Sequence, residues 1–119
     1  MTPLRPKAKK RRERDIQKAI LALRIPGLVL FKTGAGAFRV NGRFVRMGHK
    51  GVSDLVGWYQ RKIVQDHRHF FMAQFCAVEV KAEGKKPTPE QAAFLQHVRD
   101  AGGIAIVAYS TEDVINALR

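Results

Sequence analysis

Three charged residues in two separate stretches of the chain have the types and spacing of a hydrolytic metal site. Glu79 and Lys81 end the apolar run 70–81 and, if that run is a strand, point to the same face. Asp54 lies in another apolar stretch, where an isolated carboxylate is unexpected. If the two strands are adjacent, both carboxylates and a backbone carbonyl such as that of Val80 can ligate Mg²⁺. With Lys81 positioning a bound water or offsetting charge, these groups suit phosphodiester hydrolysis.

The alternative interpretations of these residues, and of other candidate residues, give less support for a catalytic site. Glu-x-Lys is common in charged sequences, so spacing alone favours a solvated strand end with a weak ion pair; Asp54 shifts the balance. A zinc site has little support, because there is one cysteine and the four histidines are dispersed at His49, His67, His69 and His97. Ser53 and Cys76 have no histidine placed by motif to activate them. Trp58 and Tyr59 could stack on bases, although aromatic residues at a strand end more often pack.

Hydrophobic periodicity and turn residues predict the elements that must position this site. Ile16, Ala19, Ile20 and Leu23 form one helical stripe that ends before Pro26. Asn41-Gly42 indicates a tight hairpin turn between two arginine-bearing strands. Thr88, Pro89 and Gln91 form a helix start with a capping box. The remaining expected segments are strands at 28–31, 50–59, 70–81 and 104–109, a loop or edge extension at 60–69, and a last helix from Ser110 to Leu118.

Length and charge define the class of protein. A chain of 119 residues is one ordinary domain, and we expect a flexible basic arm at 1–12 before a single domain at 13–119. The formal net charge of +12 calls for a polyanionic partner, with nucleic acid ranked well above a membrane surface, because the most basic segment has no apolar face. A lone cysteine and the lack of an apolar secretory stretch predict a cytoplasmic protein that is not secreted.

Several short motifs occur in a recognisable order along the chain. They are Gly51-x-x-Asp54, Glu79-x-Lys81 with Gly84-Lys85-Lys86, Pro89-x-Gln91, Gly102-Gly103, and an apolar strand ending in Ser110-Thr111-Glu112-Asp113. In this order and spacing the chain resembles the VRR-Nuc family of the PD-(D/E)XK nuclease superfamily, over nearly its whole length from Glu13. Ser53 departs from the pattern, since the family usually has proline there.

The resemblance implies a fold and an activity. The fold would be α/β, with a restriction-endonuclease-like αβββαβ core and a mixed central sheet flanked by helices. The activity would be Mg²⁺- or Mn²⁺-dependent DNA cleavage, with Asp54 and Glu79 as metal ligands and Lys81 as the catalytic lysine. Gln91 would reach the site from the second helix, unless its capping box uses the side chain, and an acid on the first helix would be Glu13. Small stand-alone members resemble phage-borne enzymes that dimerise and act on branched DNA such as Holliday junctions. The resemblance therefore implies a cytoplasmic location in a bacterial host cell or at its nucleoid.

The excess of basic residues fits the same hypothesis. Charges around the metal site would bind phosphates without base specificity. The candidate residues for DNA binding are Lys50, Lys85, Lys86, Arg39, Arg43, Arg46, Arg11 and Arg12. The first hypothesis is therefore a structure-selective, homodimeric DNA endonuclease. The competing hypothesis is a non-catalytic nucleic-acid-binding module on the same fold.

Overall fold

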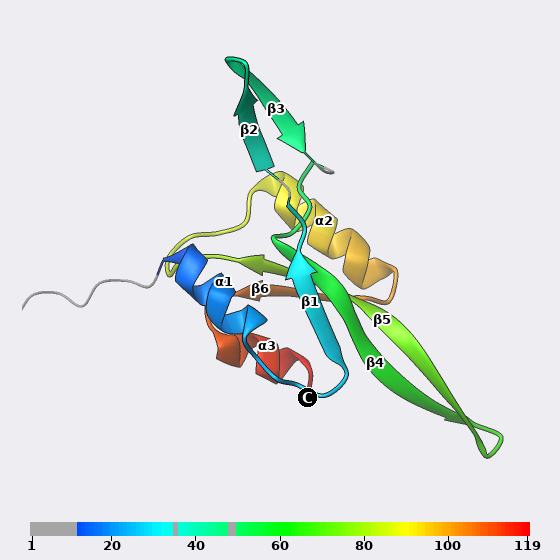
Figure 1. Ribbon diagram of the computed structural model, residues 1–119. Coiled ribbons are helices and arrows are strands. Elements are labelled where there is room, and N and C mark those ends of the chain that lie inside the picture. Colours follow the sequence, from blue (N-terminus) through cyan, green and yellow to red (C-terminus); the bar gives the residue numbers. More distant parts are fainter. Residues whose placement is uncertain (1–11, 35, 48–49) are drawn as a thin grey trace, which may run out of the picture.

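The computed structural model describes residues 12–34, 36–47 and 50–119 of the chain. Its elements follow the order α1, β1 to β5, α2, β6 and α3 (Figure 1). Their bounds are α1 Glu13–Leu21, β1 Leu28–Lys32, β2 Gly36–Val40, β3 Arg43–Met47, β4 Leu55–Gln65, β5 Arg68–Val80, α2 Pro89–Asp100, β6 Ile104–Ala108 and α3 Thr111–Ala117.

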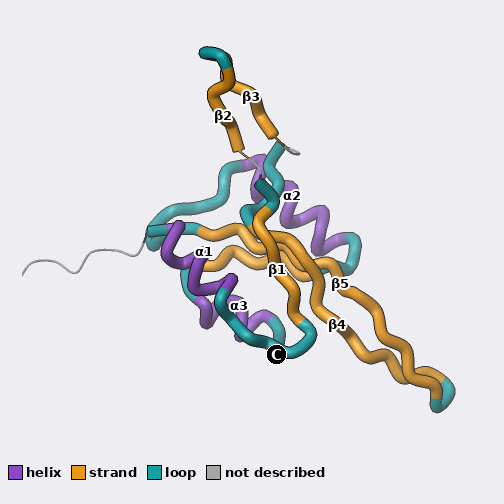
Figure 2. The backbone as a smooth tube through the Cα atoms, viewed as in Figure 1, coloured by secondary structure: helices purple, strands orange, loops and turns teal. Residues whose placement is uncertain are grey.

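The central sheet has the strand order β1-β4-β5-β6. β4 pairs antiparallel with β1 and with β5, whereas β6 pairs parallel with β5 through a crossover that contains α2. β2 and β3 form a separate hairpin that stands apart from the sheet (Figure 2). Leaving this hairpin and α3 aside, the order is αβββαβ. The expected α/β class and mixed sheet flanked by helices are therefore confirmed.

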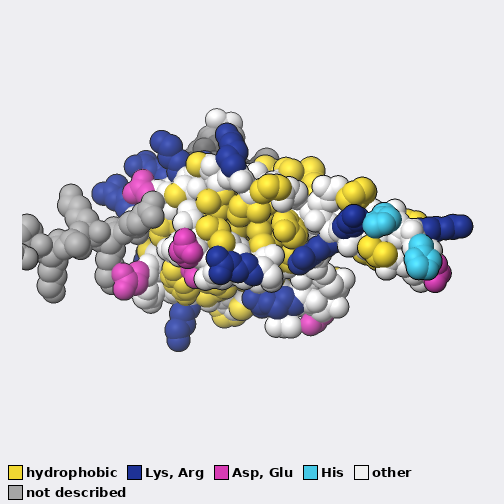
Figure 3. All heavy atoms as spheres, turned by 90° about the horizontal axis from the view of Figure 1, so that it is seen from below, with side chains coloured by type: hydrophobic (Ala, Val, Ile, Leu, Met, Phe, Trp, Pro, Cys, Tyr) yellow, Lys and Arg dark blue, Asp and Glu magenta, His cyan; other side chains and the backbone are white. Residues whose placement is uncertain are grey.

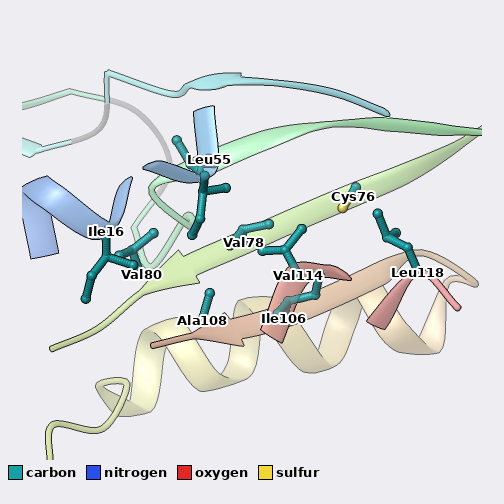
Figure 4. Packing of buried hydrophobic residues seen from close by; sticks show 10 residues of the cluster. Ile16, Leu55, Cys76, Val78, Val80, Ile106, Ala108, Val114 and Leu118 are labelled. Atoms are coloured by element: carbon teal, nitrogen blue, oxygen red, sulfur yellow. The ribbon is translucent and has the colours of Figure 1, made fainter. Parts of the chain in front are cut away.

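The main core lies between the sheet and the helices α1 and α3. Ile16 and Ile20 come from one stripe of α1, and Val78 and Val80 alternate along β5 (Figure 4). All four are at most 2 % exposed. Because strand side chains alternate in direction, the intervening residue Glu79 is directed to the other face of the sheet.

The second face of the sheet is covered by α2 over only part of its length. Leu95 and Val98 of α2 pack on Ala77 of β5, close to the carboxyl end of that strand. The first half of β5, from Arg68 to Phe75, is almost entirely exposed. An apolar run such as 70–81 is typical of a central strand covered on both faces, but this prediction is wrong for the first half of β5, where seven of the eight residues are exposed.

The segment 60–69, expected as a loop or edge extension, is instead a continuation of two strands. Cross-strand pairing runs without a break to Gln65 and Arg68, and Asp66 and His67 make the turn with positive φ angles of 49° and 62°. The prediction was wrong because this polar, basic segment has no hydrophobic alternation, while backbone pairing needs none. We call residues 60–73 the distal ribbon; it projects from the body of the molecule (Figure 1).

Two element boundaries also differ from the sequence prediction. The strand expected at 50–59 begins only at Leu55, because residues 50–54 form a loop. The first helix ends at Leu21 rather than continuing to Pro26. The capping box that starts α2 is present as predicted, with both reciprocal hydrogen bonds. None of the helices in the described ranges is long and apolar enough to cross a membrane.

Candidate active site

Asp54 and Glu79 lie side by side because β4 and β5 are neighbouring strands. Leu55, which follows Asp54, pairs directly with Val78, which precedes Glu79. The Asp54 Oδ2 atom accepts a hydrogen bond of 2.8 Å from the backbone N–H of Val80. A carboxylate at the start of β4 is thus joined to the end of β5, 26 residues further along the chain.

Glu79 is a buried carboxylate with one oxygen satisfied. Its side chain is 2 % exposed, and its Oε1 atom lies 3.4 Å from the Nζ atom of Lys81. Its Oε2 atom has no hydrogen-bond partner within the described part of the chain. Such a group is costly to bury, so it indicates that this oxygen binds either a proton or a cation.

The electrostatic surroundings of Glu79 favour its protonated form. Burial, the largest cause, and the neighbouring Asp54 carboxylate together raise the pKa of Glu79 from 4.5 to about 7, although Lys81 opposes the shift. Two carboxylates this close repel each other when both are charged. A divalent cation between them would remove that repulsion and give Oε2 a partner.

The donor set fits a hard cation such as Mg²⁺ or Mn²⁺. Asp54 and Glu79 supply carboxylate oxygens, and a backbone carbonyl is available from Val80, which follows Glu79 and whose N–H donates to Asp54. Across residues 12–34, 36–47 and 50–119 no three His, Cys, Asp or Glu side chains gather in a way that could hold a metal. Magnesium tolerates this, because it usually keeps several waters and binds through only one or two carboxylates.

The loop before Asp54 is held by contacts that position the carboxylate. The Ser53 hydroxyl is buried and donates to the carbonyl of Leu55 at 2.8 Å. Thr33, after β1, donates its hydroxyl to the carbonyl of Ser53 at 3.0 Å. Ser53 therefore has a structural partner, which agrees with its rejection as a nucleophile.

Gly51 allows this loop to pass close to α2. Its φ angle is +81°, and a Cβ atom there would collide with the carbonyl oxygen of Glu90. Lys50 makes an exposed ion pair of 3.5 Å with Glu90. The Gly51-x-x-Asp54 motif thus describes a loop that needs glycine at its first position in order to place the acid at its last.

Comparison with known protein families agrees with this geometry. The VRR-NUC domain matches residues 27–112, a range that contains Asp54, Glu79 and Lys81. The chain belongs to the VRR-NUC family. Neither the curated proteins nor the solved structures gave a match. Membership makes this a nuclease-type domain whose partner is DNA.

In this VRR-NUC domain Glu13 lies near the site but contacts backbone. The Glu13 Oε1 atom accepts a hydrogen bond of 3.3 Å from the N–H of Ala82, the residue after Lys81. The first turn of α1 therefore meets the end of β5 at the active-site edge. Asp15, the neighbouring acid on α1, is exposed and has no such contact among the described hydrogen bonds.

Gln91 satisfies the capping box of α2 instead of reaching the carboxylates. Its Oε1 atom accepts from the N–H of Thr88 at 2.9 Å, and its own N–H donates to the Thr88 hydroxyl at 3.2 Å. The capping contact and the active-site contact would use the same side-chain atoms of Gln91, and the structure shows the capping contact.

The basic residues expected to bind DNA are distributed unevenly around the VRR-NUC domain. Lys85 and Lys86 are exposed on the loop that follows Lys81, and Arg12 and Arg43 are also exposed. Arg11 and His49 lie outside the described residues, as do the side chains of Arg39 and Arg46 on the β2–β3 hairpin. Lys and Arg side chains, with histidines, also gather at the far end of the distal ribbon (Figure 3).

The other residues that were considered for chemistry either have a structural role or lie away from the carboxylates. Burial raises the pKa of the Cys76 thiol to about 11, so it stays protonated as an inert core residue. His67 and His69 sit at the turn of the distal ribbon, away from the carboxylates. Trp58 is 42 % exposed and packs edge-on against Phe31, while the Tyr59 ring lies against the Arg61 guanidinium.

The structure reveals supporting residues that sequence reasoning did not select. Thr33 and Tyr109 hold the loops on either side of the site, yet both lie far from the acids in sequence. The available signal was a hydroxyl residue at or just after the end of a predicted strand. Such residues are too common for this signal to single out Thr33 and Tyr109.

The raised pKa of Glu79 predicts a pH-dependent stability. Folding increases proton affinity at Glu79, so the free energy of unfolding should fall as the pH rises from about 4.5 to 7 and then level off, by at most about 1.4 kcal/mol per pH unit for one proton. Urea unfolding in the presence of a chelator measures this, and Glu79→Gln should remove the slope. Parallel curves for the two proteins would contradict the assignment.

Proposed function

We propose that this VRR-NUC domain is a Mg²⁺- or Mn²⁺-dependent DNA endonuclease that hydrolyses phosphodiester bonds. The observation that supports the proposal most directly is the buried Glu79 Oε2 atom, which has no hydrogen-bond partner among residues 12–34, 36–47 and 50–119 and lies in a site that also holds Asp54 and Lys81. A structural ion pair would not require the second carboxylate. A metal site has a use for it, because carboxylates are the ligands that hard cations prefer.

Each residue of the proposed site has a distinct task. Asp54, Glu79 and the carbonyl of Val80 would hold the cation. When bound, the cation would neutralise phosphate charge and lower the pKa of a water molecule. Lys81 is 13 % exposed, and its ammonium group is oriented by Glu79, so it is positioned to hydrogen-bond that water or to offset negative charge on the phosphate. Glu13 positions the backbone after Lys81 through Ala82.

Cleavage assays on the purified protein test the proposal. With Mg²⁺ or Mn²⁺ the protein should cut DNA, a chelator should stop the reaction, and added metal should restore it. Lys81→Ala should remove most of the activity while leaving the fold intact, and Lys18→Ala on the exposed side of α1 is the matched control. Salt-sensitive DNA binding without cleavage by either metal would instead identify the domain as a non-catalytic binding module.

We further propose that the enzyme selects branched DNA, including four-way junctions, over linear duplex. The exposed cations lie on three separate parts of the molecule: Arg43 on the β2–β3 hairpin, Lys85 and Lys86 on the loop between β5 and α2, and others at the far end of the distal ribbon (Figures 1 and 3). Charges spread this widely can contact more than one duplex arm. A panel of single-stranded, duplex, flap and four-way substrates with each metal measures the preference, and equal rates on duplex and four-way DNA would contradict it.

The proposed enzyme acts as a homodimer that forms through an uncovered apolar surface. We call this surface the open sheet face; it lies beside α2 and consists of Val29, Phe31, Trp58, Phe71 and Phe75. Val29, Trp58 and Phe75 are aligned across three strands by the pairing register. The five side chains are 41–66 % exposed and include no charge that could bind DNA.

The size and symmetry of the open sheet face suit a second copy. At about 150–250 Å² per large aromatic side chain, the five residues offer on the order of 400–500 Å² of apolar surface. A standard interface needs roughly 800 Å² per partner, so neighbouring backbone and side chains would supply the remainder. A two-fold axis would bring the same face of each copy together.

Salt should affect dimerisation and DNA binding in opposite directions. Each copy carries a formal charge of +12, so screening should strengthen an apolar dimer contact while it weakens phosphate contacts. Sedimentation at about 50 and 500 mM salt measures the mass. Trp58→Ser with Phe75→Ser should yield monomers, whereas Ile63→Ser on the opposite face of the distal ribbon should not. A monomeric wild type at every concentration and salt would contradict the proposal.

A further inference from the structure

The loop between Lys81 and α2 carries two exposed cations close to the proposed active site. Lys85 and Lys86 follow a turn in which the N–H of Lys85 donates to the carbonyl of Ala82 at 3.0 Å. Gly84 supplies the φ angle of +84° in that turn. We call residues 82–88 the lysine loop. Both lysine side chains are exposed, so the shape of the loop depends on how its backbone is held.

Both ends of the lysine loop are held by hydrogen bonds. Its first residue, Ala82, donates to Glu13 of α1, and the preceding N–H of Lys81 donates to the carbonyl of Ala108 at 3.0 Å. Its last residue, Thr88, belongs to the capping box of α2. The middle of the loop, which presents the two lysines, has neither of these supports.

Tyr109 supplies the missing contact in the middle of the loop. Its hydroxyl donates a hydrogen bond of 2.7 Å to the backbone carbonyl of Lys85. The tyrosine itself is anchored, because its N–H donates to the Asp113 Oδ2 atom at 2.8 Å and because it directly follows Ala108, which pairs with Val80. The contact therefore ties the lysine loop to the same part of the sheet that carries Glu79.

We propose that Tyr109 is a positioning residue that holds the lysine loop in the shape in which Lys85 and Lys86 contact the phosphate backbone beside the active site. The inference rests on the proposed function, because it assumes that DNA passes the Asp54 and Glu79 carboxylates. Tyr109 acts through the backbone of Lys85, so its effect requires the two ammonium groups. Without the hydroxyl, the loop samples more conformations, and ordering it on binding costs affinity.

A binding cycle on the full-length protein tests the role of Tyr109. DNA affinity is measured without metal for wild type, Tyr109→Phe, Lys85→Ala with Lys86→Ala, and the combined triple variant. Loss of one hydrogen bond should weaken binding by about 3–10-fold for Tyr109→Phe in the wild-type loop. In the loop without lysines the same change should have less than about a twofold effect, because nothing remains for the tyrosine to position.

Kinetics and salt dependence separate positioning from a merely structural role. Tyr109→Phe should raise KM for DNA in proportion to the weaker binding and leave kcat unchanged, because the metal site is untouched. Removal of both lysines should lower the slope of log affinity against log salt by about 1–2. The thermal stability of Tyr109→Phe, measured alongside, should stay close to that of the wild type.

Three results would overturn the proposal. The first is unchanged affinity of Tyr109→Phe, and the second is an equal loss in the loop with and without lysines. If Tyr109→Ala does weaken binding in that first case, the effect belongs to stacking of the ring on a base. The third is unchanged binding after removal of both lysines, because the loop then contacts no DNA, whereas metal-dependent cleavage would still support the proposed function.

Discussion

Replacement of Asp54 by asparagine is expected to lower the DNA cleavage rate by about 10³-fold with either Mg²⁺ or Mn²⁺. An asparagine side-chain oxygen can still accept the hydrogen bond from the N–H of Val80, so the end of β5 should keep its place. The negative charge, however, is lost, and with it one of the two proposed carboxylate ligands. Single-turnover cleavage of a labelled substrate measures the rate.

The control for this substitution is the same chemical change at a distant position. Asp66→Asn lies in the turn of the distal ribbon, where asparagine tolerates the positive φ angle, and should cleave as the wild type does. Binding of DNA to Asp54→Asn without metal should be unchanged or tighter, because an anion has been removed from a phosphate-binding surface. A cleavage rate within about tenfold of wild type would show that Asp54 does not hold the cation.

Replacement of Gly57 by alanine is expected to cause the largest loss of stability. Gly57 lies in β4 opposite Leu30 of β1, and a Cβ atom there would collide with the backbone carbonyl of Val29. Backbone cannot move aside as a flexible side chain can, so β1 must separate from β4. We expect the free energy of unfolding to fall by about 3 kcal/mol or more. Urea unfolding, followed by circular dichroism, measures the change.

Gly102→Ala is the matched comparison for Gly57→Ala. Gly102 has a φ angle of +94°, but a Cβ atom there would meet nothing within 4 Å. This variant therefore isolates backbone strain, which costs on the order of 1–3 kcal/mol. If Gly57→Ala costs no more than Gly102→Ala, the close approach of β1 to β4 does not limit stability.

Local patterns in the sequence predicted the elements that local physics controls. The Thr88–Gln91 capping box was readable because its hydrogen bonds join residues three apart. The Asn41-Gly42 turn was readable because few residues adopt its positive φ angles. The distal ribbon was not, since its strands are held by cross-strand backbone bonds between polar residues that carry no hydrophobic signal.

Some features of the candidate site were also predictable from local sequence patterns, and others were not. Alternation along the strand at 70–81 placed Glu79 and Lys81 on one face from the sequence alone. The sequence did not show whether this strand pairs with the strand of Asp54, because adjacency in a sheet depends on the whole topology. The side chain of Gln91 could satisfy a cap or reach the site, and only the structure showed which contact it makes.

By itself, the sequence determined the residue types available for chemistry, the strong positive charge, and the helices and strands whose periodicity or turns are local. Only the tertiary structure decided that Asp54 meets the end of β5, that burial raises the pKa of Glu79, and that Tyr109 holds the lysine loop. The physical reason is that these features depend on contacts between residues far apart in the sequence, 26 positions for Asp54 and Val80 and 24 for Lys85 and Tyr109, or on burial away from water. Local propensity contains no information about either.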